Sequence, residues 1–248
     1  MSDESVQSVE RAISLLLALD ARSPSLDAGT LSTRTGLSRS TVYRLLGTLE
    51  RTGMVRKRGT RFELGQQVLK LAGGFRAANQ ISVQAKAVLD ELAQQVQTGV
   101  TLAVLDGEVV VTVETGNAPN GHYVLQPHEL GRRIPASATS VGRMLLAFQE
   151  TTSTDESTSS TIDDHNSHAS EQIRRQGFAL TSGLLEAGVR TIAVPVFDEA
   201  GTVVAGLGIL ADANRTSAEQ LAGDHLVKLR AAADRLTQLA NWQPSATN

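Results

Sequence analysis

The chain has 248 residues, 41% of them hydrophobic, and a formal net charge of −3. This length exceeds the usual size of one domain, about 100–200 residues, so we expect two domains with packed cores rather than a disordered chain. The absence of cysteine excludes disulfides, thiol nucleophiles and cysteine-ligated zinc. Because the N-terminus is acidic and no apolar run approaches about 20 residues, we expect a soluble, cytoplasmic protein with no membrane partner.

The charge is distributed unevenly along the chain. Residues 1–80 hold 12 Lys/Arg and 7 Asp/Glu, a net charge of +5, whereas residues 81–248 hold 11 and 19, a net charge of −8. Between Arg34 and Arg61, eight basic residues accompany a single acid, Glu50. Such asymmetry is typical of a nucleic-acid-binding module joined to an acidic body, although a basic stretch alone is more often a solvated surface.

Three helices are predicted at the N-terminus. Apolar residues at helical spacing predict the first over residues 6–19, ending before Pro24, and a shorter second helix over 28–35 ends at Gly36. Ser38 is a suitable N-cap for the third, because its hydroxyl can accept from a free amide of the first turn. The third helix carries one apolar stripe, formed by Val42, Leu45, Leu46 and Leu49.

A basic hairpin follows the third helix. Residues 54–58 and 61–64 predict two short strands joined at Gly59-Thr60. Three helices and a hairpin are the layout of a winged helix-turn-helix, whose third helix enters the major groove. Arg44 can pair with guanine, and the cations of the hairpin can neutralise phosphates. The alternative for the third helix is an ordinary amphipathic surface helix, and the alternative for Tyr43 is packing against the hairpin. The predicted DNA-binding residues are Ser38, Arg39, Ser40, Thr41, Tyr43, Arg44, Lys57, Arg58 and Arg61.

The rest of the chain alternates between helical and extended patterns. A helix over 66–79 is interrupted by Gly73-Gly74, which suggests either a hinge or close packing against another helix. Thr151 to Ser170 is a polar stretch that predicts an exposed loop. The remaining predicted elements are helices at 81–97, 139–149, 169–176 and 217–240 and strands at 100–105, 109–114, 121–126, 178–182, 189–197 and 203–210.

Motifs for chemistry are weak. Gly206 to Ala211 superficially matches a dinucleotide fingerprint, but it lies inside a predicted strand, so we expect no cofactor. His165 and His168 beside Asp163 and Asp164 could suggest a metal site, although such a pair in a polar loop is usually only solvated. The sequence contains no GxSxG, HExxH or P-loop motif. We therefore expect no enzyme; the alternatives are an effector-binding domain with hydrolase-like activity, with His122 or His128 as a base, and a structural scaffold without DNA affinity.

Motifs spread over nearly the whole chain resemble the IclR family of bacterial transcriptional regulators. The resemblance implies an α+β fold: a winged helix-turn-helix domain at 1–65, a linker helix at 66–80 and a GAF-like α/β effector domain with a mostly antiparallel sheet at 81–248. It also implies double-stranded operator DNA, a small-molecule effector and self-association as a dimer or dimer of dimers. The motifs that carry the resemblance lie at 6–12, 37–46, 49–55, 62–65, 131–136, 142–147 and 188–198.

The resemblance also implies an effector pocket. The helix that begins near Thr139 can present free amides to a carboxylate. Family members that bind small oxo acids usually have a cysteine at the position of Thr191 and serines near Gly208 and Leu210, which this chain lacks, so we expect a roomier pocket for an aromatic or medium-sized carboxylate such as a hydroxybenzoate. The implied effector-binding residues are Tyr123, Gln126, Ser140, Val141, Thr181, Val189, Thr191, Gly208 and Leu210.

Overall fold

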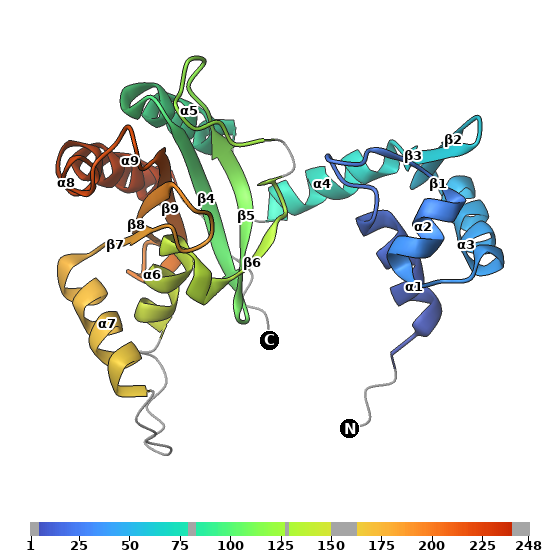
Figure 1. Cartoon of the computed structure of the whole chain (residues 1–248), viewed down its shortest axis with the longest axis horizontal. Coiled ribbons are helices and arrows are strands. Elements are labelled where there is room, and N and C mark those ends of the chain that lie inside the picture. Colours follow the sequence, from blue (N-terminus) through green and yellow to red (C-terminus); the bar gives the residue numbers. More distant parts are fainter. Residues whose placement is uncertain (1–4, 79–82, 127–128, 150–162, 240–248) are drawn as a thin grey trace. The chain divides into compact units, whose positions relative to one another are not determined.

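The structure is a computed structural model that describes residues 5–78, 83–126, 129–149 and 163–239. The chain divides into two compact units, Met1–Arg76 and Ala77–Asn248. Figure 1 shows the first unit in blue to cyan and the second in green to red. The separate linker over residues 66–80 stays a prediction.

The N-terminal unit has the predicted three helices and hairpin. One element was not predicted: β1 is a three-residue strand that pairs with β3, so the sheet order is β1-β3-β2. Because β1 is so short and follows Pro24, it has no detectable alternation of apolar and polar residues. The elements of this unit are α1 (Gln7–Leu17), β1 (Ser25–Asp27), α2 (Ala28–Thr35), α3 (Arg39–Arg51), β2 (Val55–Arg58), β3 (Arg61–Leu64) and α4 (Gln67–Ala78).

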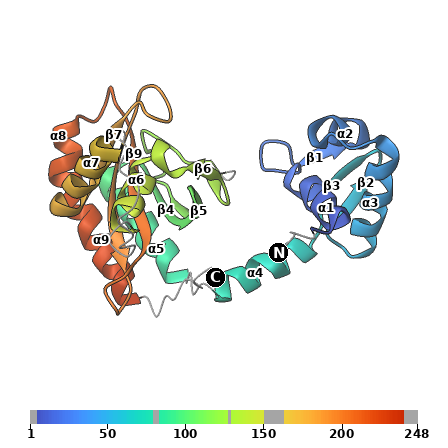
Figure 2. The ribbon, with the colours of Figure 1, turned by 90° about the horizontal axis from the view of Figure 1, so that it is seen from below.

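One core holds this unit together. Leu15, Leu31 and Leu46 come from α1, α2 and α3 and are almost completely buried, and they pack with Val55 and Phe62 of the small sheet. Figure 2 shows these three helices gathered around the strands. Burying a large aliphatic side chain contributes about 1.5–3 kcal/mol, so this cluster fixes how α3 is presented.

The helix α4 runs without a break through Gly73 and Gly74. Both glycines are exposed, and a Cβ added to either would meet no heavy atom of the described structure within 4 Å. Close packing, which the sequence had left as one explanation for the pair, is therefore not seen in the described part of the chain. The hinge stays a prediction.

The second unit is built on one six-stranded sheet of order β6-β5-β4-β9-β8-β7 in which every pairing is antiparallel. Residues 163–170, expected to belong to an exposed loop, lie in α7 instead; residues 150–162 are outside the described part. The elements are α5 (Val83–Val96), β4 (Gly99–Asp106), β5 (Val109–Gly116), β6 (Arg133–Pro135), α6 (Ser140–Gln149), α7 (Asp163–Gln176), β7 (Ala179–Ser182), β8 (Val189–Phe197), β9 (Val203–Asp212), α8 (Ala218–Gln220) and α9 (Leu226–Leu239).

Helices cover both faces of this sheet. Leu207 and Ile209 of β9 and Ile192 of β8 point to the side where α5 and α9 pack, whereas Ala193 and the neighbouring alternate residues face α6. The near-continuous apolar runs of β8 and β9 agree with strands that are covered on both faces. The face toward α6 and the adjoining loops holds the cavity described below.

The predicted strand at 121–126 is wrong. This segment is irregular, and its backbone is held by a side chain: Asn117 accepts from the Leu125 amide at 2.7 Å and donates to the Leu125 carbonyl at 2.9 Å. The strand beside β5 is β6 instead. An asparagine that replaces a ladder partner satisfies the backbone without a strand, and the sequence pattern does not reveal this.

The C-terminal helix begins as predicted but is not continuous. Ser217 and Gln220 form a capping box before α8. A π-helical turn over Leu221–His225, with a non-helical conformation at Gly223, then separates α8 from α9. A winged helix-turn-helix and an α/β domain with an antiparallel sheet together confirm the predicted fold class.

Candidate DNA-binding surface and effector cavity

The start of α3 is set by two residues. Gly36 ends α2 in the left-handed conformation, with φ of 70°, and Ser38 caps α3 by accepting from the Thr41 amide at 3.3 Å. The Ser38 hydroxyl also lies 3.0 Å from the hydroxyls of Ser40 and Thr41. The first turn of α3 therefore presents a cluster of hydroxyls at the positive end of a helix dipole, an arrangement suited to a phosphate.

The outer face of α3 is exposed and basic. Val42 and Leu46 are buried, whereas Arg39, Tyr43 and Arg44 are exposed. Tyr43 is 58% exposed, which argues against its packing on the hairpin. The Tyr43 and Arg44 side chains have no hydrogen-bond or ion-pair partner among the residues that the structure describes. They are therefore available to a partner molecule.

The hairpin cations are exposed but less free. Lys57 lies over the Phe62 ring, 5.9 Å from its centroid, and Arg58 lies 3.9 Å from the Glu63 carboxylate. Arg61 donates to the backbone carbonyl and the hydroxyl of Ser25 on β1. These contacts orient side chains whose remaining donors and charge still face solvent. Such positions suit phosphate contacts, which add affinity without reading the sequence.

The second unit contains a cavity on the α6 face of its sheet. The cavity has a volume of about 70 Å³. One buried water needs about 10–15 Å³ on the same scale, so the cavity has room for a small organic molecule rather than for one ion. Eight of the nine implied effector-binding residues lie around it. These are Tyr123, Ser140, Val141, Thr181, Val189, Thr191, Gly208 and Leu210.

Gln126 does not belong with them. Its side chain is exposed and is not part of the cavity wall, and its backbone carbonyl accepts from the Glu129 amide at 2.9 Å. Gln126 was assigned from the resemblance alone, and its role in an effector site stays a prediction.

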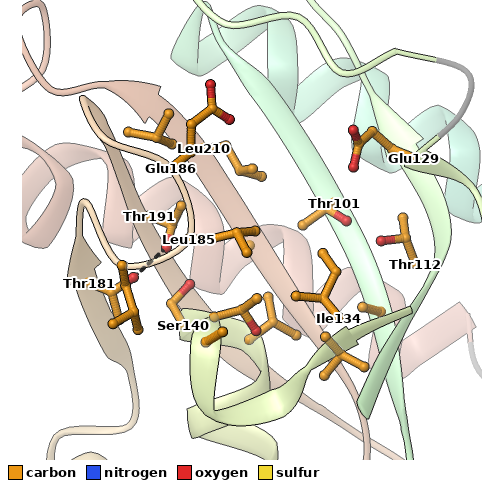
Figure 3. Close-up of a pocket in the computed structure, with 18 of the residues that line it drawn as sticks. Thr101, Thr112, Glu129, Ile134, Ser140, Thr181, Leu185, Glu186, Thr191 and Leu210 are labelled. Atoms are coloured by element: carbon orange, nitrogen blue, oxygen red, sulfur yellow. Dashed lines mark hydrogen bonds between the residues drawn. The ribbon is translucent and has the colours of Figure 1, made fainter. Parts of the chain in front are cut away.

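Threonines from four strands give the cavity a polar floor. Thr101 of β4, Thr112 of β5, Thr181 of β7 and Thr191 of β8 all line it. The hydroxyls of Thr181 and Thr191 are hydrogen-bonded at 2.8 Å, as Figure 3 shows. They face an apolar wall that includes Leu185, and a few polar groups in an apolar pocket are what orient a small ligand.

Three charged residues that line the cavity, Glu129, Arg132 and Glu186, were not predicted from the sequence. Glu129 pairs with Arg132 at 2.7 Å, and Glu186, on the loop between β7 and β8, accepts from the Tyr123 hydroxyl at 2.9 Å. Burial, together with this hydrogen bond and the nearby carboxylates of Glu186 and Glu129, raises the pKa of Tyr123 to about 12. Tyr123 is therefore a neutral donor at physiological pH. The Glu129-to-Arg132 spacing was visible in the sequence, but only the fold shows that it faces a cavity.

The first turn of α6 forms the opposite end of the cavity. Ser140 is 2% exposed and lines the cavity, yet its hydroxyl has no hydrogen-bond partner among the described residues. Figure 3 shows Ser140 at one end of the cavity, separated from Glu186 and Glu129. A buried hydroxyl without a partner costs free energy, and a ligand acceptor or a water would recover it.

The glycines of β9 are explained mainly by helix packing. A Cβ at Gly208 would lie 2.8 Å from a methyl group of Val141, and one at Gly206 would lie 2.6 Å from the other Val141 methyl. The space that Gly208 leaves is therefore largely occupied by α6. The expectation of a roomier pocket at this position is not supported by the structure.

The residues that the sequence suggested for metal binding or catalysis are only partly described by the structure. Among the described residues no group of three or more His, Cys, Asp and Glu side chains could hold a metal ion. The side chains of Asp163, Asp164 and His165 lie outside the described residues. His122 is exposed, with its Nδ1 3.2 Å from Arg215, and His128 is not described. Within the same residues, no helix has the length and hydrophobicity to span a bilayer.

A winged helix-turn-helix with a free basic face, together with a domain enclosing a small polar-and-apolar cavity, is typical of a ligand-responsive DNA-binding protein. The chain belongs to the IclR family of bacterial transcriptional regulators. Residues 77–238 match the family profile described as bacterial transcriptional regulator IclR C-terminal, and residues 8–59 match the IclR helix-turn-helix domain.

Individual relatives agree with this assignment. The Pca regulon regulatory protein of Pseudomonas putida is 30% identical over 236 residues, covering 91% of this chain and 81% of that protein. A protein from Rhodococcus sp. RHA1 described as a transcriptional regulator has a crystal structure with a TM-score of 0.74 and 28% identity, covering 95% of this chain and 98% of that chain. An IclR homologue from Microbacterium hydrocarbonoxydans, crystallised with 4-hydroxybenzoate, shares the fold, with a TM-score of 0.73, 22% identity, and coverage of 94% and 98%.

Proposed function

We propose that this chain binds operator DNA through α3 and the β2–β3 hairpin and that a small carboxylate in the cavity controls this binding. Arg44 reads a base edge in the major groove, Ser40 and Thr41 contact a phosphate or base edge, and Arg39 and Tyr43 flank them. The cations Lys57, Arg58 and Arg61 contact the backbone. The observation that carries the proposal is the exposed face of α3, whose Arg44 has no partner among the described residues.

The effector in this proposal is an aromatic or medium-sized carboxylate. Its carboxylate lies at the first turn of α6, where Ser140 is buried without a partner in the described structure and where helix amides favour an anion. Its body lies between the threonine floor and the wall that contains Val141, Val189 and Leu210. The relative crystallised with 4-hydroxybenzoate makes that compound the first probe to use.

We further propose that the chain acts as a dimer or dimer of dimers in the cytoplasm and that it acts by binding rather than catalysis. Val9, Ile13 and Leu17 recur along α1 at every fourth residue and are 53%, 48% and 74% exposed. A contiguous apolar stripe on a helix surface supports self-association. A twofold dimer would present two copies of α3 to a palindromic operator.

The test uses the full chain and a duplex that spans the DNA upstream of its own gene. Fluorescence anisotropy should show binding whose affinity falls steeply as salt is raised, and 4-hydroxybenzoate should change that affinity. Binding that is absent, or that does not depend on salt, would contradict the DNA-binding part of the proposal. Sedimentation at several protein concentrations tests the assembly, and a purely monomeric chain would contradict that part.

A further inference from the structure

The cavity has ends of opposite polarity. One end is the first turn of α6, with the buried hydroxyl of Ser140. The other holds the carboxylates of Glu129 and Glu186, and Figure 3 shows both of them away from Ser140. A ligand that spans the cavity must therefore satisfy an anion-binding end and an acceptor-rich end.

The acceptor-rich end has an excess of negative charge. Among the described residues that line this end, the acidic and basic side chains are those of Glu129, Glu186 and Arg132, and Arg132 pairs with Glu129 at 2.7 Å. No second cation of the cavity wall, as far as the structure describes it, opposes Glu186. Glu186 is an exposed residue that lines the cavity. A second carboxylate on a ligand would meet this charge as a like charge, which is unfavourable.

Glu186 also has acceptor capacity left. Its Oε2 accepts from the Tyr123 hydroxyl at 2.9 Å, whereas its Oε1 has no hydrogen-bond partner among the described residues. An ionised carboxylate accepts but never donates, and its two oxygens offer about four acceptor positions. A ligand hydroxyl or amino group could donate to the free oxygen while Tyr123 keeps its bond.

From this geometry we infer that Glu186 is a specificity-determining residue: the cavity selects monocarboxylates that carry a hydrogen-bond donor at the end remote from the carboxylate, and it rejects dicarboxylates. This inference rests on the proposed binding of a carboxylate effector. It goes beyond that proposal because it names the second functional group of the effector and the residue that recognises it. Hydrogen bonds to charged acceptors discriminate more strongly than neutral ones.

Isothermal titration calorimetry with the full chain can test this on matched probes. The aromatic series is benzoate, 4-hydroxybenzoate, 4-methoxybenzoate and terephthalate, and the aliphatic pair is 6-hydroxyhexanoate and adipate. In whichever series binds, we expect the hydroxy acid to bind at least about tenfold more tightly than the dicarboxylate and than the methyl ether. Equal affinities for the hydroxy acid and the dicarboxylate would overturn the inference.

Two variants separate recognition by Glu186 from its effect on the loop. In Glu186→Gln the side chain can still accept from Tyr123 but can also donate, so the preference for the hydroxy acid over the dicarboxylate should fall at least about tenfold. Tyr123→Phe removes the hydrogen bond to Glu186 but leaves the carboxylate, so the affinities of all probes change together and their ratio should remain. Equal losses in both variants would show that Glu186 only positions the loop, which overturns the inference.

A charge-matched control is available in the same domain. Glu199 is exposed at the turn between β8 and β9 and lies outside the cavity wall, so Glu199→Gln should leave the ratio of affinities unchanged. If none of the probes binds to the wild-type chain, the carboxylate effector of the proposed function fails together with this inference. If they bind without discrimination, only the inference fails.

Discussion

The outer face of α3 and the cavity of the second unit differ in the sign and the pairing of their charged side chains. On α3, Arg39 and Arg44 are exposed, and Arg44 has no partner in the described structure. In the cavity the guanidinium of Arg132 is paired with the Glu129 carboxylate, and the Glu186 carboxylate accepts from the Tyr123 hydroxyl. The first surface keeps cations free, whereas the second contains an excess of acceptors.

This difference follows from the two kinds of ligand. A polyanion such as DNA releases counterions when exposed cations neutralise its phosphates, so free and solvated cations suit it. A small ligand is recognised by shape and by a few hydrogen bonds from polar groups placed in a mostly apolar pocket. We therefore expect salt to change DNA binding far more than effector binding.

The largest expected effect is that of Arg44→Ala on specific DNA binding. Loss of a bidentate contact to a base edge should cost about 1–3 kcal/mol, or roughly 5- to 150-fold in affinity for the operator, while binding to unrelated DNA falls much less. Because the residue lies on the surface and contributes nothing to the core, thermal stability should not change. Competition titrations with specific and scrambled duplexes measure the ratio.

Lys57→Ala is the matched control for this variant. Its ammonium lies over the Phe62 ring on the hairpin, where we expect it to contact a phosphate. Affinity for both duplexes should fall by similar factors, and the slope of log affinity against log salt should decrease by about one. If Lys57→Ala lost discrimination between the two duplexes, the hairpin would read sequence rather than only contact phosphates.

A smaller effect is expected in α4. Replacing both Gly73 and Gly74 by alanine should strengthen the helix by about 1 kcal/mol per residue, because alanine has less backbone freedom to lose and nothing described lies within 4 Å of either added Cβ. If the pair is a hinge, the double variant binds effector and DNA separately but the effector no longer changes DNA affinity. Undiminished effector control, measured by anisotropy, would exclude the hinge.

In the cavity, Ser140→Ala should weaken a carboxylate effector by about 0.5–1.5 kcal/mol, or roughly 2- to 12-fold, because one neutral hydrogen bond is lost. DNA binding without effector should stay at the wild-type level. Ser137→Ala is a suitable control, since Ser137 is exposed just before α6 and does not line the cavity. Calorimetry on both variants gives the comparison, and equal affinities would argue against an effector at this end of the cavity.

The two sites also differ in how far the sequence predicts them. The α3 surface comes from one contiguous stretch of sequence. The cap follows from the serine at position 38, and helical spacing alone places Val42 on the buried face and Arg44 on the exposed face. The cavity needs Thr101, Thr112 and Thr191 from separate strands, and no local pattern tells which strands are neighbours. Only resemblance to a family pointed to it, and Gln126, which that resemblance implied, does not line the cavity.

The errors have physical causes. The strand at 121–126 was predicted wrongly because Asn117 holds this segment as a loop, which the sequence pattern does not reveal. The start of α7 was missed because residues 163–170 contain few apolar residues, so no periodic pattern marks a helix. Glu186 was missed because a lone acid in a loop has no pattern at all until the fold brings it to Tyr123.

The smallest predicted effect is the pH dependence of the thermal stability that Asp27 provides. Asp27 caps α2, and hydrogen bonds from the Thr30 amide and hydroxyl, followed by that from the Gly29 amide, lower the pKa of Asp27 below its usual 3.8. A carboxyl whose pKa is lower in the folded state than in the unfolded state stabilises the fold at pH values above its unfolded-state pKa. This contribution is lost as the pH falls through the folded-state pKa. In Asp27→Asn the cap acceptor remains but the charge does not. Thermal unfolding should therefore show a lower Tm for the variant at pH 7, and the difference should shrink below pH 3.8. A difference in Tm that did not depend on pH would mean that the carboxylate charge on this unit adds nothing beyond the cap.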